Sequence, residues 1–278
     1  MPELPEVETI RRSLQGPLEG ARLLSVQVRD RRLRRPVRVD ALSRLNGRRI
    51  VDIGRRGKYL LVHLVEGGGL LLHLGMSGRV LLMTQGDEID PHDHICWQVE
   101  GADACDTLEM RFRDPRRFGL VLSRARGSLG EHPLLASLGP EPFDASFNAA
   151  YLRQRASGSR RPVKNVLMDA SVVAGLGNIY VSEALWHAGL NPKIQAGRVS
   201  SARWERVRAA ILEVLASAIE QGGTTINDFR DVSGETGYFQ VQLQVYGREA
   251  QPCARCEGTI RRIAQSGRST FYCPRCQH

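Results

Sequence analysis

Hydrophobic residues follow two different spacings along this chain, one after the other. Near the N-terminus they recur every three or four residues, which predicts a short amphipathic helix over residues 5–14. From residue 21 to about 123, short apolar runs such as KYLLVHL alternate with turns rich in Gly or Asp. Many short strands of this kind predict a β-sandwich or barrel-like domain that follows the helix directly.

Helical spacing returns after a stretch rich in Gly, Pro and Ser at residues 126–144, which we interpret as a linker. The clearest helix is expected over residues 201–221, with Ser200 or Ser201 as its N-cap and Gly222 as its end. Further helices are expected over 147–156, 163–169 and 178–188, and a mobile loop over 222–240.

Composition narrows the class of protein. The 278 residues are 42% hydrophobic and 25% charged, as in soluble globular proteins. No apolar run approaches the ~20 residues of a membrane span, and the N-terminus lacks the apolar segment of a signal peptide. We therefore expect a cytoplasmic protein without a membrane partner. The net charge of +9 favours a polyanionic partner, and nucleic acid is the first candidate.

The first residues offer a candidate nucleophile. Removal of Met1 would leave Pro2 with a secondary amine, and an α-amino group titrates near ~7.7–8.0, so part of it is unprotonated at neutral pH. Such an amine can attack a sugar or carbonyl carbon and form a Schiff base. Glu3 and Glu6 supply acids within reach. The alternative is an ordinary processed terminus that starts a helix at Pro5.

Four cysteines close the chain as two C-x₂-C pairs separated by sixteen residues. This spacing predicts a zinc site, and four thiolates leave no open position, so the metal is structural. Two disulfides are the alternative, which a cytoplasmic location disfavours. The residues between the pairs predict a β-hairpin with its turn at Ser266 and Gly267, which places Arg268 at its tip. The four ligands are Cys253, Cys256, Cys273 and Cys276.

Two polar positions have open interpretations. Lys58 follows an Arg-Arg-Gly turn at the start of a strand and is either a solvated charge or a phosphate contact. Asn178 opens a helix after a Gly-rich turn, and the preceding helix contains Lys164. The N–H groups at a helix start bind phosphate, but Asn178 also fits a simple N-cap.

Two turns, at residues 73–78 and 114–119, carry the apolar side chains Met76 and Phe118. Such residues usually pack in the core. On exposed loops, however, an apolar pair beside Arg116 would resemble the wedges that unstack bases. The sequence His92-Asp93-His94 suggests a metal, yet no third ligand is near, so a structural or phosphate-facing role is the stronger interpretation.

Taken together, these motifs resemble the formamidopyrimidine-DNA glycosylase family over the whole chain. The family implies an α+β multidomain fold with three parts. These are an N-terminal catalytic β-sandwich with flanking helices (1–130), a helix-two-turn-helix domain (131–240) and a zinc finger (241–278). The motifs are MPELPEVET at 1–9, RRGKYLL at 55–61, HLGMSG at 73–78, DPRRFG at 114–119, GLGNIYVSEAL at 175–185, EQGGTT at 220–225, GYF at 237–239, LQVYGR at 243–248 and the four-cysteine finger.

The resemblance implies catalytic roles for four residues. Pro2 would attack C1′ of the damaged nucleotide, and Glu3 would supply a proton and assist opening of the sugar ring. Lys58 would act in β-elimination, and Arg268 would hold phosphate and assist δ-elimination.

It also implies a set of DNA-binding residues. Met76, Arg116 and Phe118 would fill the gap left by the extruded base. The full set is Glu6, Met76, His92, Arg116, Phe118, Arg160, Lys164, Asn178 and Tyr238. At Asn227 this sequence departs from the basic residue expected in many members, which concerns recognition of the flipped base.

The implied activity is base-excision repair. A monomer with one structural Zn²⁺ would remove oxidised purines, such as 8-oxoguanine and formamidopyrimidines, from duplex DNA near the nucleoid. It would then cleave the abasic site by β,δ-elimination. Two alternatives remain open: a non-catalytic DNA-binding protein, and a glycosylase for oxidised pyrimidines.

Overall fold

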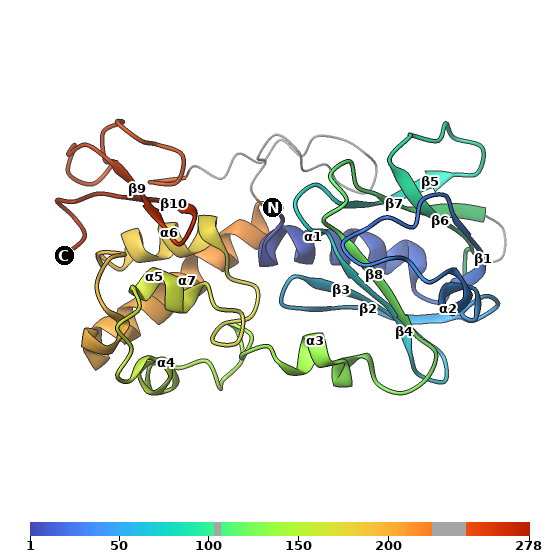
Figure 1. The fold of residues 1–278 in the computed structure, drawn as a ribbon, viewed down its shortest axis with the longest axis horizontal. Helices are drawn as coiled ribbons and strands as arrows, with labels where there is room; N and C mark the ends of the chain where they lie inside the picture. The colour runs from blue at the N-terminus through green and yellow to red at the C-terminus, as the bar shows by residue number, and fades with distance from the viewer. Residues whose placement is uncertain (103–106, 224–242) are drawn as a thin grey trace. The chain divides into compact units, whose positions relative to one another are not determined.

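The computed structural model describes residues 1–102, 107–223 and 243–278, which fall into two compact units (Figure 1). The first contains Met1–Ala136 within those ranges, together with Gly222 and Gly223. The second contains Ser137–Gln221 and residues 243–278. The boundary lies inside the predicted linker. Cys105, Asn227 and Tyr238, with most of the predicted 222–240 loop, lie outside the described residues.

The first unit begins with helix α1 (Leu4–Leu18), one turn longer than the apolar spacing predicted. Leu18 extends the buried stripe of Val7, Ile10 and Leu14 by another four residues, and its exposed fraction is 0%. The Glu19 N–H donates to Gln15 O and closes the added turn. Burial of one more leucine therefore outweighs the presence of Pro17 within the helix.

Two four-stranded antiparallel sheets follow, which confirms the predicted β-sandwich. One sheet has the order β1-β6-β7-β5, made of β1 (Arg22–Val28), β6 (Asp93–Glu100), β7 (Thr107–Arg113) and β5 (Arg79–Thr84). The other has the order β2-β3-β4-β8, made of β2 (Ile50–Arg56), β3 (Tyr59–Leu64), β4 (Gly69–His73) and β8 (Leu120–Arg124). Short helices α2 (Val39–Ser43) and α3 (Pro133–Ala136) and a 3₁₀ turn (Leu129–Glu131) complete the unit.

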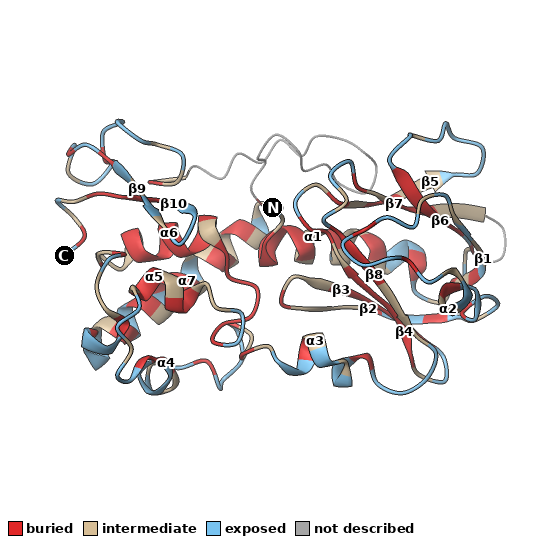
Figure 2. Ribbon diagram, in the orientation of Figure 1, coloured by how far each residue is buried: buried red, intermediate tan, exposed pale blue. Residues whose placement is uncertain are grey.

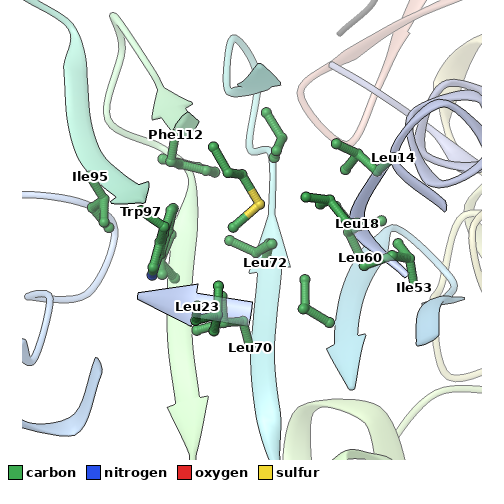
Figure 3. Packing of buried hydrophobic residues seen from close by; sticks show 14 of the residues in the cluster. Leu14, Leu18, Leu23, Ile53, Leu60, Leu70, Leu72, Ile95, Trp97 and Phe112 are labelled. Atoms are coloured by element: carbon green, nitrogen blue, oxygen red, sulfur yellow. The ribbon is translucent and has the colours of Figure 1, made fainter. Parts of the chain in front are cut away.

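The core of the first unit combines both sheets with α1. Leu14 and Leu18 of the helix belong to the same buried cluster as Leu60 of β3, Leu23 of β1 and Trp97 of β6 (Figure 3). Burial of this large apolar area stabilises the elements that carry the N-terminal residues and the loops described below.

The second unit is helical, with a hairpin at its C-terminal end. Its helices are α4 (Ala149–Ala156), α5 (Val163–Leu167), α6 (Asn178–His187) and α7 (Ser201–Glu220), with a 3₁₀ turn at Ala196–Arg198. Ser200 caps α7, since its Oγ accepts the Arg203 N–H at 3.4 Å. The predicted apolar face of α7 is buried (Figure 2): Trp204, Val207, Ile211, Leu215 and Ala218.

The hairpin consists of β9 (Arg261–Gln265) and β10 (Arg268–Tyr272). Its two turn residues, Ser266 and Gly267, have φ angles of 48° and 74°. Two positive φ values in a two-residue turn are those of type I′, whose twist matches that of the flanking strands. The turn therefore lies at the two residues predicted for it.

Across the described residues, we find no helix with both the length and the apolar character needed to cross a membrane.

Candidate active site and DNA-binding residues

The N-terminal residues are held by the first turn of α1. The Glu3 N–H donates to Glu6 Oε2 at 2.8 Å, and the Glu3 side chain in turn accepts the backbone N–H of Glu6, so the two acids form a capping box. Both acidic residues are buried, with exposed fractions of 2% and 3%. The box therefore fixes the Glu3 carboxylate in the residue that follows Pro2, and Glu6 is the residue that holds it there.

Arg55 connects α1 to the turn that carries Lys58. Its Nε donates to Glu8 Oε2 at 3.1 Å, and its Nη1 donates to Gly57 O at 3.0 Å. Both side chains of the Arg55–Glu8 pair are 12% exposed. Burial raises the pKa of Glu8, but hydrogen bonds from Arg11, Arg12 and Arg55 outweigh it and leave that pKa below its usual value.

Lys58 itself lies in the β2–β3 turn, one residue before the strand begins at Tyr59. The contacts of Arg55 with Glu8 and with Gly57 thus connect α1 to the turn that carries Lys58.

His73 packs against Tyr59, the residue after Lys58, and the sequence had given no reason to single it out. Burial, and then the positive charges of Lys58 and Arg34, lower its pKa to about 4. Its Nδ1 accepts the Gly75 N–H at 2.9 Å, and its ring packs against Tyr59 with a centroid distance of 4.9 Å. The imidazole is therefore neutral at physiological pH with its proton on Nε2. The signal available in sequence was a single histidine at the end of an apolar strand.

Asp114 joins the two loops that carry the predicted wedge residues. Its Oδ1 accepts the Ser77 hydroxyl at 2.7 Å, and its Oδ2 accepts the Gly119 N–H at 2.7 Å. Asp114 has an exposed fraction of 0%. The loops touch at Gly75, where an added Cβ would lie 2.4 Å from the carbonyl carbon of Phe118. Only glycine fits there, which also suits its φ of 62°.

Met76 and Phe118 are exposed on these loops, with exposed fractions of 39% and 48%. The Arg116 guanidinium carbon lies 5.2 Å from the centroid of the Phe118 ring. Packing in the core, the usual fate of such side chains, is therefore excluded for both residues. An apolar pair beside an arginine is the arrangement that the wedge hypothesis requires.

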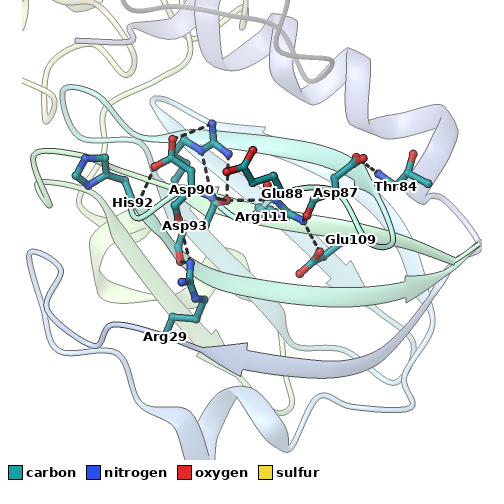
Figure 4. A network of polar contacts seen from close by, with 10 residues as sticks. Arg29, Thr84, Asp87, Glu88, Asp90, His92, Asp93, Glu109 and Arg111 are labelled. Atoms are coloured by element: carbon teal, nitrogen blue, oxygen red, sulfur yellow. Dashed lines mark hydrogen bonds and ion pairs between the residues drawn. The ribbon is translucent and has the colours of Figure 1, made fainter.

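The His92–His94 segment has a structural explanation for two of its residues. Asp93 pairs with the buried Arg111 at 3.3 Å and with Arg113 at 2.6 Å, in the polar network of Figure 4. His94 Nε2 lies 2.8 Å from Asp114 O. His92 is exposed. In the described ranges the only cluster of three or more potential metal ligands is the cysteine group, so the metal interpretation of this segment is wrong.

In the second unit, two side chains converge on one carbonyl of the hairpin. Asn178 Nδ2 and Lys164 Nζ each donate to Ser269 O at 3.0 Å, and Lys164 Nζ also donates to Thr270 Oγ1 at 2.6 Å. Lys164 has an exposed fraction of 0%. Its ammonium group therefore connects helix α5 to the hairpin.

The N-cap interpretation of Asn178 is wrong. Gly177 is the N-cap of α6, and Asn178 is the first helical residue. The amide of Asn178 donates to the hairpin instead. Arg160 and Arg268 are exposed, the latter at the hairpin tip. The tip is attached to α5 by Asn165 Nδ2, which donates to Ser266 Oγ at 2.8 Å.

The four predicted zinc ligands lie together, with all their Sγ atoms within 4.8 Å of one another. Cys253 and Cys276 Sγ are 3.9 Å apart, and Cys256 and Cys273 Sγ are 3.5 Å apart. A tetrahedral site with Zn–S bonds of ~2.3 Å requires sulfur separations of about 3.8 Å, so these residues fit the metal. They do not form disulfides. The chain therefore has one structural zinc site.

Glu183 of α6 holds the segment that leads into the finger, and no sequence motif pointed to this role. It is 3% exposed, and its carboxylate accepts three backbone N–H groups, from Gln244 at 2.7 Å, Val245 at 3.0 Å and Tyr246 at 2.8 Å. A buried carboxylate with three such donors is fully used by the fold.

A proline at position 2 followed by a buried glutamate, a β-sandwich with Met76 and Phe118 exposed on its loops, and a four-cysteine finger together match the features of a zinc-finger DNA-repair glycosylase. Three family models match the chain. They are the formamidopyrimidine-DNA glycosylase N-terminal domain (residues 1–121), the formamidopyrimidine-DNA glycosylase H2TH domain (138–230), and the zinc finger found in FPG and IleRS (250–278). The chain belongs to the formamidopyrimidine-DNA glycosylase family.

Individual relatives agree over the full length. The formamidopyrimidine-DNA glycosylase of Methylococcus capsulatus is 49% identical over 277 residues, covering 100% of both chains. The crystal structure of the MutM (Fpg) protein of Thermus thermophilus has 41% identity and a TM-score of 0.85, covering 99% of this chain and 98% of that one. A Lactococcus lactis Fpg mutant in complex with Fapy-dG-containing DNA has 32% identity and a TM-score of 0.88, covering 100% of both chains.

Proposed function

We propose that the protein excises oxidised purines from duplex DNA and then cleaves the strand at the abasic site through a Schiff base on Pro2. The observation that carries the proposal is the capping box, which holds the buried Glu3 carboxylate in the residue after Pro2, whose nitrogen becomes the terminal amine when Met1 is removed. Removal of Met1 is required, because a Pro2 nitrogen within a peptide bond is a tertiary amide and does not attack.

The chemistry follows from the secondary amine. Its attack on C1′ breaks the bond to the base, which leaves with the bonding electrons and takes up a proton. The amine then loses its own proton, and the C1′–O4′ bond opens onto a protonated ring oxygen to give an iminium that is positively charged without a proton. This charge acidifies C2′, so loss of the C2′ proton expels the 3′-phosphate, and a second elimination expels the 5′-phosphate. In this scheme Glu3 protonates the sugar ring oxygen, Lys58 acts in the first elimination, and Arg268 holds phosphate during the second.

The damaged base must leave the helix, because its C1′ is out of reach inside a duplex, and this costs a few kcal/mol. Met76 and Phe118 with Arg116 would occupy the space it leaves, and their exposure supports this role. The net charge of +9 would supply salt-dependent affinity for the backbone.

Phosphate contacts are proposed for His92, Arg160, Asn178 and Tyr238, the last outside the described residues. For Lys164 the contacts to Ser269 and Thr270 support a different role, in which it positions the hairpin of Arg268.

Oxidised purines are the proposed substrates because of what the relatives bind. The Lactococcus protein was solved with Fapy-dG-containing DNA, and a 34% identical MutM with DNA containing carbocyclic 8-oxo-G. The proposal further includes a monomer that acts in the cytoplasm at the nucleoid, with parts at 1–130, 131–240 and 241–278.

Borohydride reduction tests the proposal. With a duplex containing 8-oxoguanine, the native protein should give a covalent adduct at Pro2, and Pro2→Gly, checked for intact zinc content, should lose it. A variant with one residue added before Pro2 should also fail. No adduct from the native chain, or full trapping by Pro2→Gly, would refute the proposal. Parallel duplexes with thymine glycol separate purine from pyrimidine specificity.

A further inference from the structure

Trp186 joins helix α6 to the cysteine site by a polar contact. Its indole Nε1–H donates to Cys253 Sγ at 3.4 Å. The residue is only 5% exposed, and it packs in the apolar cluster that contains Cys253, Ile260 and Phe271. A nitrogen–sulfur distance of this length is that of a hydrogen bond to a large, polarisable acceptor.

The finger itself holds this indole in place. Arg255, which lies between the first two cysteines, places its guanidinium carbon 4.2 Å from the centroid of the Trp186 ring. The same side chain donates from Nη1 to Trp186 O at 3.1 Å. Two contacts from one arginine restrict the ring to the orientation that directs its N–H at sulfur.

We propose that Trp186 is an outer-sphere residue of the zinc centre and that its N–H···S bond strengthens the binding of the metal. Four thiolates around Zn²⁺ leave the centre with a net charge of −2. A donor at one sulfur disperses part of that charge and fixes the ligand's orientation. Such second-layer hydrogen bonds typically change metal affinity by about 10–100-fold.

Trp186 is the second residue of α6 that contacts the finger. Asn178, at the start of α6, donates to Ser269 O of the hairpin, while Trp186, two turns later, donates to Cys253. One helix thus contacts the finger at its tip and at its metal ligands. This inference goes beyond the proposed reaction, since it concerns the metal site and does not depend on the lesion.

The chain contains its own control for the test. Trp186→Phe removes the N–H donor and keeps an aromatic ring. Trp204 in α7 is 0% exposed, and its Nε1 has no hydrogen-bond partner within the described part of the chain. Trp204→Phe therefore makes the same chemical change in the core of the same unit without removing a bond to sulfur.

Zinc affinity of the two full-length proteins should be measured by equilibrium competition with a chromogenic chelator. Trp186→Phe should bind zinc about 10-fold more weakly or worse, and Trp204→Phe should stay within about two-fold of wild type, well below that range. Unchanged affinity in Trp186→Phe, or an equal loss in both variants, would overturn the proposal.

Two further readouts separate the hydrogen bond from packing. In cobalt(II)-substituted protein, the thiolate-to-metal charge-transfer band should move to longer wavelength in Trp186→Phe only, because an unbonded sulfur gives up electron density more easily. In the wild-type protein, exchange of the Trp186 indole proton should accelerate on metal removal while that of Trp204 does not. An unmoved band, or unchanged exchange at Trp186, contradicts the inference.

Discussion

His73 illustrates how a single buried side chain can set a pH limit on the first unit. Its pKa in the folded protein is about 4, below the ~6.5 of an exposed histidine. Between these values the unfolded chain takes up a proton that the native protein does not. The contribution of neutral His73 to the free energy of unfolding should therefore be fully present above pH ~6.5. It should be lost as the pH drops toward 4, which lowers the free energy of unfolding by up to roughly 3 kcal/mol.

Chemical denaturation at pH 7, 6 and 5 measures this effect, with His73→Gln as the comparison. The variant, which has no titrating group at this position, should show a flatter dependence over that range. Equal slopes for the two proteins would contradict the role assigned to His73.

At the scale of residues, sequence predicted chemistry better than contacts. Spacing and residue type identified the four cysteines, because metal geometry depends on few neighbours, whereas the role of Pro2 stays a prediction. The positions of Asn178 and Lys164 could not be derived, since both bind a hairpin about 90 or more residues away. Asp114, Glu183 and His73 were missed for the same reason: burial of a polar residue is visible only once its partners are placed.

Among the elements, α1 is joined to the β2–β3 hairpin by a largely buried ion pair in addition to apolar packing. Arg55→Met should destabilise the protein by about 1–3 kcal/mol, because it leaves a mostly buried Glu8 carboxylate with one donor fewer. It should also lower the rate of Schiff-base formation, since Lys58 follows the Gly57 carbonyl that Arg55 binds.

Arg12→Met is the matched control. Arg12 binds the same carboxylate, but its side chain is 57% exposed, so its loss should cost less than about 1 kcal/mol. Urea denaturation and borohydride trapping of both variants test the comparison, and equal effects would show that the buried pair is not what joins the elements.

Short apolar runs separated by turns predicted seven of the eight strands of the sandwich, in the runs LLSVQV, KYLLVHL, LLLHLG, RVLLM, ICWQV, TLEMRF and FGLVLS. Strand β2 was not predicted, since its irregular register between Ile50 and Asp52 interrupts the alternation and Arg55 and Arg56 read as a turn. Helix α2, in which only Leu42 is buried, was not predicted either.

For the whole molecule, zinc removal should unfold the finger and leave the β-sandwich of the first unit folded. The apolar cluster of the finger includes Cys253 and Cys273 themselves, so it loses its support with the metal. The core of the first unit contains no zinc ligand. Chelation should therefore abolish DNA binding, measured by fluorescence anisotropy of a labelled duplex, while most β-sheet circular dichroism remains.

Added zinc should restore binding, which serves as the control for irreversible damage. Full DNA affinity without metal would refute the structural role of the site.

The buried Lys164 has a practical consequence for covalent labelling. The chain contains three lysines, and one of them has an exposed fraction of 0% and donates two hydrogen bonds. Amine-directed reagents should therefore spare Lys164 in the folded protein and modify Lys58, Lys193 and the terminal Pro2. A fluorophore attached at Lys193, which lies 5.1 Å from the Tyr272 ring, would report on the finger. The choice of arginine over lysine almost everywhere restricts a common, unselective reagent to a few sites.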